Sequence, residues 1–114
     1  MWMVKGQSFI ELYSNRACTD KLQKDENGCY IYDFPLISTN AYNPLTFSLF
    51  AKNNGDHSAY DLSVVCVNDE DTKISVPITT VRSLGVGIIK ISTPILKGET
   101  TTKTLEFKVS YDSI

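Results

Sequence analysis

Residues 104–111 read Thr-Leu-Glu-Phe-Lys-Val-Ser-Tyr, and this stretch decides the fold class. Apolar and polar residues alternate along all of it, so that Leu105, Phe107, Val109 and Tyr111 share one side. Successive side chains of a β-strand point to opposite faces, and the alternation therefore predicts a strand with one buried and one solvent-facing side.

Six further segments have the pattern or composition of strands, and turn signals separate them. Residues 45–52 are the clearest of these, because every second residue is apolar. Asn-Gly pairs at residues 27–28 and 54–55 mark turns, since both residue types adopt positive φ with little strain. Pro77 favours an edge position for its strand. The seven expected strands are residues 8–13, 29–34, 45–52, 59–67, 72–78, 88–92 and 104–111, and residues 19–28 are expected to form a polar loop.

The composition agrees with an all-β fold. The chain has 114 residues, of which 42% are apolar and 21% charged, as in a soluble globular domain. Ile, Val and Thr together number 29, whereas only 4 residues are Ala. β-Branched residues favour strands over helices. The sequence predicts one domain over residues 1–114, an antiparallel two-sheet β-sandwich of about seven strands, with a closed barrel as the alternative.

Charge and hydropathy argue against two classes of partner. The 11 Lys and Arg residues are outnumbered by 13 Asp and Glu residues, so there is no basic excess to neutralise nucleic-acid phosphates. Uninterrupted apolar runs are three or four residues long, far below the ~20 residues of a membrane-spanning helix. The N-terminal residues lack the pattern of a secretory signal. We expect synthesis in a cytoplasm, with neither a nucleic acid nor a membrane as partner.

Residues with metal-binding or catalytic chemistry are few. Cys18 and Cys29 flank the polar loop and are either free or paired, whereas Cys66 lies on the apolar side of the expected strand 59–67, together with Tyr60. His57 is the only histidine, which leaves zinc without enough ligands and a nucleophile without a separate base. The acidic run 68–72 lacks the spacing of a calcium loop. We therefore expect no catalytic residue, no metal and no cofactor.

Two apolar features have the character of an interface. Tyr30 and Tyr32 share one face of their strand, where either the core or a protein or carbohydrate partner takes them up. The apolar N-terminus has no place in a seven-strand count. Either residues 1–7 are an arm that adds to the sheet of a neighbour, or Trp2 folds back on its own sandwich. The candidate interface residues are Met1, Trp2, Met3, Tyr30, Tyr32 and Tyr42.

Two stretches of the chain resemble bacterial and bacteriophage immunoglobulin-like domains. Residues 50–64, Phe-Ala-Lys-Asn-Asn-Gly-Asp-His-Ser-Ala-Tyr-Asp-Leu-Ser-Val, are similar to the strand–corner–strand of such domains. Residues 95–100, Ile-Leu-Lys-Gly-Glu-Thr, are similar to the turn before their final strand. The resemblance covers residues 45–112 and implies an immunoglobulin-like sandwich. The paired core cysteines and the central tryptophan of antibody domains are missing.

The resemblance, together with the absent catalytic groups, implies a non-enzymatic structural protein of a phage virion, in its tail, neck or capsid surface. Its expected partners are other virion proteins or copies of itself, held through edge strands and the N-terminal arm. The alternative is a carbohydrate- or cell-surface-binding sandwich that recognises a glycan.

Overall fold

The computed structural model describes residues 6–35, 44–95 and 102–113, and these contain eight strands and no helix. The all-β prediction is confirmed. The strands are β1 (Ile10–Tyr13), β2 (Gln23–Lys24), β3 (Tyr30–Pro35), β4 (Leu45–Asn53), β5 (Tyr60–Cys66), β6 (Lys73–Ser75), β7 (Val86–Thr93) and β8 (Thr102–Asp112).

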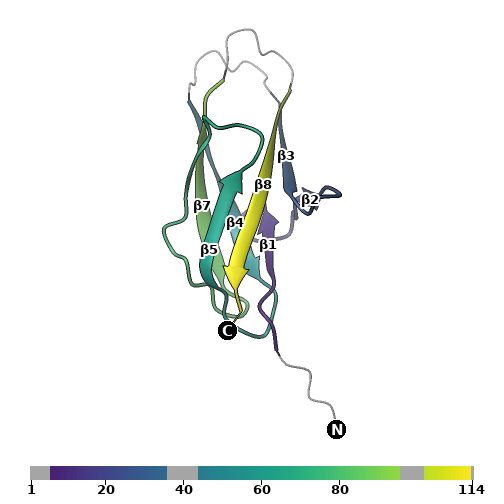
Figure 1. Ribbon diagram of the computed structural model, residues 1–114, viewed down its shortest axis with the longest axis vertical. Helices are drawn as coiled ribbons and strands as arrows, with labels where there is room; N and C mark the ends of the chain where they lie inside the picture. Colours follow the sequence, from purple (N-terminus) through teal and green to yellow (C-terminus); the bar gives the residue numbers. More distant parts are fainter. Residues whose placement is uncertain (1–5, 36–43, 96–101, 114) are drawn as a thin grey trace.

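The strands form two antiparallel sheets of four that pack face to face as a β-sandwich (Figure 1). One sheet has the order β1-β4-β7-β6 and the other β2-β3-β8-β5. β6 lies at an edge, as Pro77 predicts, and it is shorter than expected because it ends at Ser75. The extra strand β2 lies in the expected polar loop, where two residues pair with the start of β3. The sequence has no apolar alternation that would predict such a short strand.

Five strands follow the order of an immunoglobulin domain. In that fold, strands B, E and D are neighbours in one sheet and C and F in the other. Here β4, β7 and β6 take the first three places, and β5 and β8 take the other two. In immunoglobulin domains the last strand, G, lies beside strand F. Here β8 takes the place of F, and its neighbour on that side is β3, which precedes β4 in the chain. β8, the last strand, consequently lies inside its sheet.

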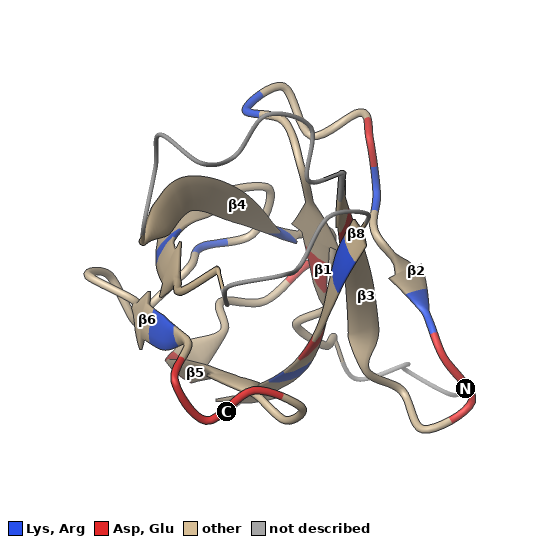
Figure 2. Ribbon diagram, turned by 90° about the horizontal axis from the view of Figure 1, so that it is seen from above, with Lys and Arg blue, Asp and Glu red and all other residues tan. Residues whose placement is uncertain are grey.

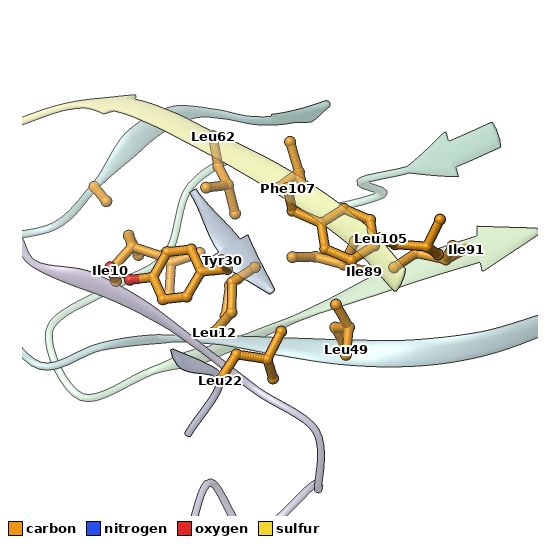
Figure 3. Packing of buried hydrophobic residues seen from close by; sticks show 14 residues of the cluster. Ile10, Leu12, Leu22, Tyr30, Leu49, Leu62, Ile89, Ile91, Leu105 and Phe107 are labelled. Carbon is orange, nitrogen blue, oxygen red and sulfur yellow. Dashed lines mark hydrogen bonds between the residues drawn. The ribbon is translucent and has the colours of Figure 1, made fainter. Parts of the chain in front are cut away.

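The core fills the space between the inner faces of the two sheets (Figure 3). β8 contributes Leu105 and Phe107, which are both fully buried, as their alternation predicts. Leu49 from β4 and Ile89 from β7 meet them from the other sheet. Each fully buried aliphatic or aromatic side chain stabilises the fold by roughly 1.5–3 kcal/mol. The alternating pattern therefore fixes which face of each sheet turns inward.

The start of β5 departs from the expected alternation. Tyr60 is 40% exposed although the pattern places it on the same side as buried Leu62. Asp61 has a φ of 54°, and the register against β8 shifts between Tyr60 and Ser63, which is a β-bulge. The extra residue in a bulge turns the preceding side chain to the other face. A short-range alternation cannot reveal such an insertion.

All three cysteines are free thiols. Of the two alternatives for Cys18 and Cys29, the structure shows the unpaired one. Cys29 is buried, whereas Cys66 is only half-buried near the end of β5. Cys66 packs against the core, as its place on the apolar side predicts, but it stays half-buried because it lies near the end of the strand. Its thiol donates to the side-chain oxygen of Asn68 at 3.3 Å.

Candidate functional site

The described part of the sandwich has four edge strands, and polar groups occupy the edge of β1. The backbone amide of Ile10 donates to the hydroxyl of Tyr111, and the hydroxyl of Tyr30 donates to the carbonyl of Ile10. Two residues further along β1, the carbonyl of Leu12 accepts a hydrogen bond from the amide of Leu22 at 2.9 Å. These bonds occupy the groups with which a foreign strand would have to pair, so β1 is closed to strand addition.

Tyr30 is a core residue that closes this edge. Its ring is 2% exposed and lies among the buried side chains (Figure 3). Burial and the nearby carboxylate of Glu11 raise the pKa of Tyr30, which keeps its hydroxyl protonated as a donor. The sequence left two alternatives for Tyr30, burial in the core or contact with a partner, and the structure shows burial in the core. The interface role expected for Tyr30 is therefore corrected, because a buried ring cannot meet a partner.

Two other edges are short. β2 has two residues and is followed by a turn in which Asp25 accepts bonds from the amides of Asn27 and Cys29. β6 has three residues. Very short edge strands are one of the means by which proteins prevent pairing with another chain. Neither strand offers a long template.

β5 is the longest of the four edge strands, with seven residues. The amide of Leu62 points away from β8, since it donates to the carbonyl of Thr79, whereas the amide of Val67 donates to Glu106 of β8. Backbone groups alternate in direction along a strand. The amides and carbonyls of Val64 and Cys66 therefore point outward like the amide of Leu62, along the side of the sheet on which none of the described strands follows.

Side chains on β5 favour pairing rather than prevent it. Val65 and the following Val67 are 48% and 51% exposed on the outer face. The strand contains neither proline nor lysine, and its one charged residue is Asp61 in the bulge. Edge strands are commonly protected by such residues. β5 and β6 lie side by side at the margin of the sandwich (Figure 2), and they do not pair with each other. Residues 64–67, the open edge of β5, are the candidate functional site.

Sequence reasoning recognised residues 59–67 as a strand but did not single out Val65 and Val67. Their signal is the run Val64-Val65-Cys66-Val67, which lacks protective charges. A run of this kind fits a central strand equally well. Only the strand order shows that it lies at an edge.

The end of β4 fixes the segment that leads toward residues 1–5. Asn53 is fully buried, and its side-chain oxygen accepts bonds from the amides of Phe9 and Gly55, each at 3.0 Å. Its side-chain nitrogen donates to the carbonyls of His57 and Val81. One side-chain amide thus bonds four backbone groups, and all of its donors and acceptors are used.

Gln7 is held at the same corner. Its amide donates to the carboxylate of Asp56 at 2.8 Å, and its carbonyl accepts bonds from the amides of Asp56 and His57. This backbone bond, together with the contact between Asp56 and His57, lowers the pKa of Asp56. The predicted arm, residues 1–7, consequently has a fixed base at Gln7.

The remaining predicted interface residues divide into two groups. Tyr32 is half-buried and stacks on Phe47 from the opposite sheet, with 5.0 Å between the ring centroids, and Phe34 contacts both rings. This cluster joins the two sheets. Met1, Trp2, Met3 and Tyr42 lie outside the described residues.

The acidic run and the histidine have local partners. Asp69 forms an ion pair with Lys103 at 2.8 Å, and the amide of Asp71 also donates to Asp69. His57 contacts Asp56 at 3.2 Å. Within residues 6–35, 44–95 and 102–113, no group of three or more His, Cys, Asp or Glu side chains is placed to hold a metal ion. These same ranges contain no helix with the length and hydropathy to cross a membrane.

Comparison of the chain with models of protein families, with curated proteins and with solved structures finds no match.

Proposed function

We propose that this chain is a non-enzymatic structural component of a phage virion, which joins to neighbouring copies by strand addition at the open edge of β5. The observation that carries the assembly mode is the pair of outward-facing backbone positions at Val64 and Cys66 beside two exposed valines. Strand addition satisfies such backbone groups and buries the flanking side chains. The virion assignment rests on the resemblance of residues 45–112 to phage immunoglobulin-like domains.

The pairing segment is the N-terminal arm of a neighbouring copy. Residues 1–5 read Met-Trp-Met-Val-Lys, so four of the five are apolar. Five extended residues reach about 17 Å, which is enough to span the four residues of the open edge, 64–67. The base of the arm is held at Gln7, whose backbone amide and carbonyl already form hydrogen bonds within their own sandwich. Burial of the arm against Val65 and Val67 contributes about 25 cal/mol per Å² of apolar surface.

The experiment compares molar mass in solution by size exclusion with light scattering over a concentration series. The full chain is expected to form oligomers, and the chain without residues 1–5 is expected to remain monomeric. Val65→Glu is expected to abolish assembly as well, since it charges the open edge. Because Val65 lies opposite Lys108, a glutamate there gains a cross-strand ion pair and the fold is kept.

Val86→Glu is the matched control. Val86 is 45% exposed and lies opposite Lys52, but on β7, which runs between β4 and β6. The control is expected to assemble like the full chain. Assembly of Val65→Glu at the same concentrations as Val86→Glu would overturn the β5 mode. Assembly of the chain without residues 1–5 would overturn the role of the arm. Labelling of purified virions by an antibody against the chain tests the virion assignment separately.

A further inference from the structure

A hollow of about 490 Å³ lies on the sheet that does not contain β5. Among the described residues, three consecutive ones from each of β4, β6 and β7 line it, and none comes from the other sheet. The hollow is therefore on the outer face of this sheet, away from the core. Its volume is in the range of small-molecule sites, which span about 300–1,000 Å³.

The strand register arranges six outward side chains as a grid. Across the sheet, Thr46 of β4 pairs with Ser92 of β7, which pairs with Lys73 of β6. The next row has the order Ser48, Lys90 and Ser75. Adjacent strands are about 4.8 Å apart and alternate residues about 7 Å, so the grid measures about 10 by 7 Å. Five of the six side chains are exposed, and Ser92 is half-buried.

The charge of this grid has one sign. Lys73 and Lys90 are diagonal neighbours on adjacent strands, and none of the described residues that line the hollow is a carboxylate. Within the described part of the chain, neither lysine takes part in an ion pair. Two ammonium groups at this spacing attract an anion, in particular one that bridges both of them.

We propose that this hollow binds an acidic saccharide, whose carboxylate lies between the ammonium groups of Lys73 and Lys90. The four hydroxyls of the grid donate and accept, which suits the ring hydroxyls of a sugar. An acidic peptide presents amides and aliphatic carbons at these positions and uses the four hydroxyls less fully. The site is independent of the open edge of β5, and it gives a virion component a means to contact a cell-surface polymer.

The test titrates the full chain with trigalacturonate, and with neutral galactotriose and triglutamate for comparison, by NMR in low salt. Trigalacturonate is expected to shift the amide signals of residues around Lys90 and Lys73, and galactotriose is expected to leave them unchanged. In Lys73→Gln/Lys90→Gln, the dissociation constant for trigalacturonate is expected to rise at least tenfold. The control Lys52→Gln/Lys108→Gln removes two positive charges outside the hollow. It is expected to change the dissociation constant for trigalacturonate less than twofold.

Three results would overturn the proposal. The first is unchanged affinity in Lys73→Gln/Lys90→Gln, and the second is an equal loss in the control pair, which would mean non-specific charge attraction. The third is binding of triglutamate as tight as that of trigalacturonate, which would make the hollow an acidic-peptide site. Amide spectra of each variant without ligand show whether it is folded, so loss of binding is separated from loss of structure. The amide signals of Val64 and Cys66, at the open edge of β5, are not used to measure binding in the hollow.

Discussion

Gly55 lies so close to Gln7 that a β-carbon on Gly55 would stand 2.1 Å from the carbonyl oxygen of Gln7. The Asn-Gly pattern predicts the turn at this place correctly, but the reason for the glycine is different. Among the described glycines, Gly28 has a positive φ, of 79°, as the Asn-Gly rule expects. Gly55 is required instead because another segment of backbone packs against it.

Gly55→Ala is expected to destabilise the fold by about 1–3 kcal/mol, because the added carbon forces the Gln7 segment away. Urea denaturation measures the change, and the amide signals of residues 7–9 show where it occurs. Gly28→Ala is the control, since its β-carbon meets nothing within 4 Å. Gly28→Ala is expected to lower the free energy of unfolding by about 1–2 kcal/mol through the strain at positive φ alone, and to leave the amide signals of residues 7–9 unchanged. Equal perturbation of the Gln7 segment by both variants would contradict the packing explanation.

Asn53→Ala is expected to cost at least about 2 kcal/mol, since it leaves buried amides and carbonyls without their partner. Asn53→Asp separates the two halves of the side chain. It keeps an acceptor for the amide of Phe9 but, when ionised, cannot donate to the carbonyl of Val81. We expect it to be destabilised at pH 7 and to recover in part when the carboxyl is protonated. Thermal unfolding at two pH values tests this, and a pH-independent loss would contradict the donor role.

Asp69→Asn is expected to destabilise the fold by about 1–3 kcal/mol, because Lys103 loses its ionic partner in a largely buried position. Lys103 still donates to the carbonyl of Pro94, so the loss is not larger. Circular dichroism during urea titration measures it. A variant as stable as the natural chain would show that the pair contributes nothing.

The same ion pair predicts a pH dependence. Burial raises the pKa of Asp69, but the hydrogen bonds from Lys103 and from the amide of Asp71, together with the charge of Lys103, outweigh it, and the pKa lies below its ordinary value of 3.8. A lowered pKa in the folded state means that the contribution is complete above the unfolded pKa and is lost as the pH falls through the folded one. Stability should therefore fall below about pH 4, and less steeply in Asp69→Asn. Parallel pH profiles would contradict the assignment to Asp69.

Leu84→Gly is expected to stabilise the fold by up to about 1 kcal/mol. Leu84 is 69% exposed and has a φ of 63°, a conformation that costs a residue with a β-carbon about 1–2 kcal/mol. Glycine removes this strain, and its greater freedom in the unfolded chain offsets part of the gain. Leu84→Ala keeps the β-carbon and is expected to gain nothing. A thermal melting temperature that rises equally in both variants would assign the effect to the exposed side chain instead.

The sequence predicts the sandwich well where alternation is long and regular. β4 and β8 are found close to their true bounds, because each must present an unbroken apolar face to the other sheet. β2 is missed because backbone pairing with β3 holds it, and its side chains are exposed. The bulge at Asp61 is missed because one inserted residue leaves no trace in composition.

The candidate site is harder to predict, because it depends on which strand has no neighbour. The run at residues 64–67 identifies a strand, but the open side of β5 follows from the order of all four strands in its sheet. The grid around Lys73 and Lys90 likewise depends on the registers of β4, β7 and β6. Residues far apart in the sequence form both surfaces, and a pattern within one segment cannot bring them together.

The most direct test of strand addition is hydrogen exchange of individual β5 amides by NMR, at low and at high protein concentration. The amides of Val64 and Cys66 point to the open side, whereas that of Val67 is already bonded to β8. Assembly is predicted to slow the exchange of the first two by at least tenfold and to leave Val67 unchanged. In Val65→Glu, exchange at all three positions is predicted to be independent of concentration. Oligomers that form without added protection at Val64 and Cys66 would contradict the account.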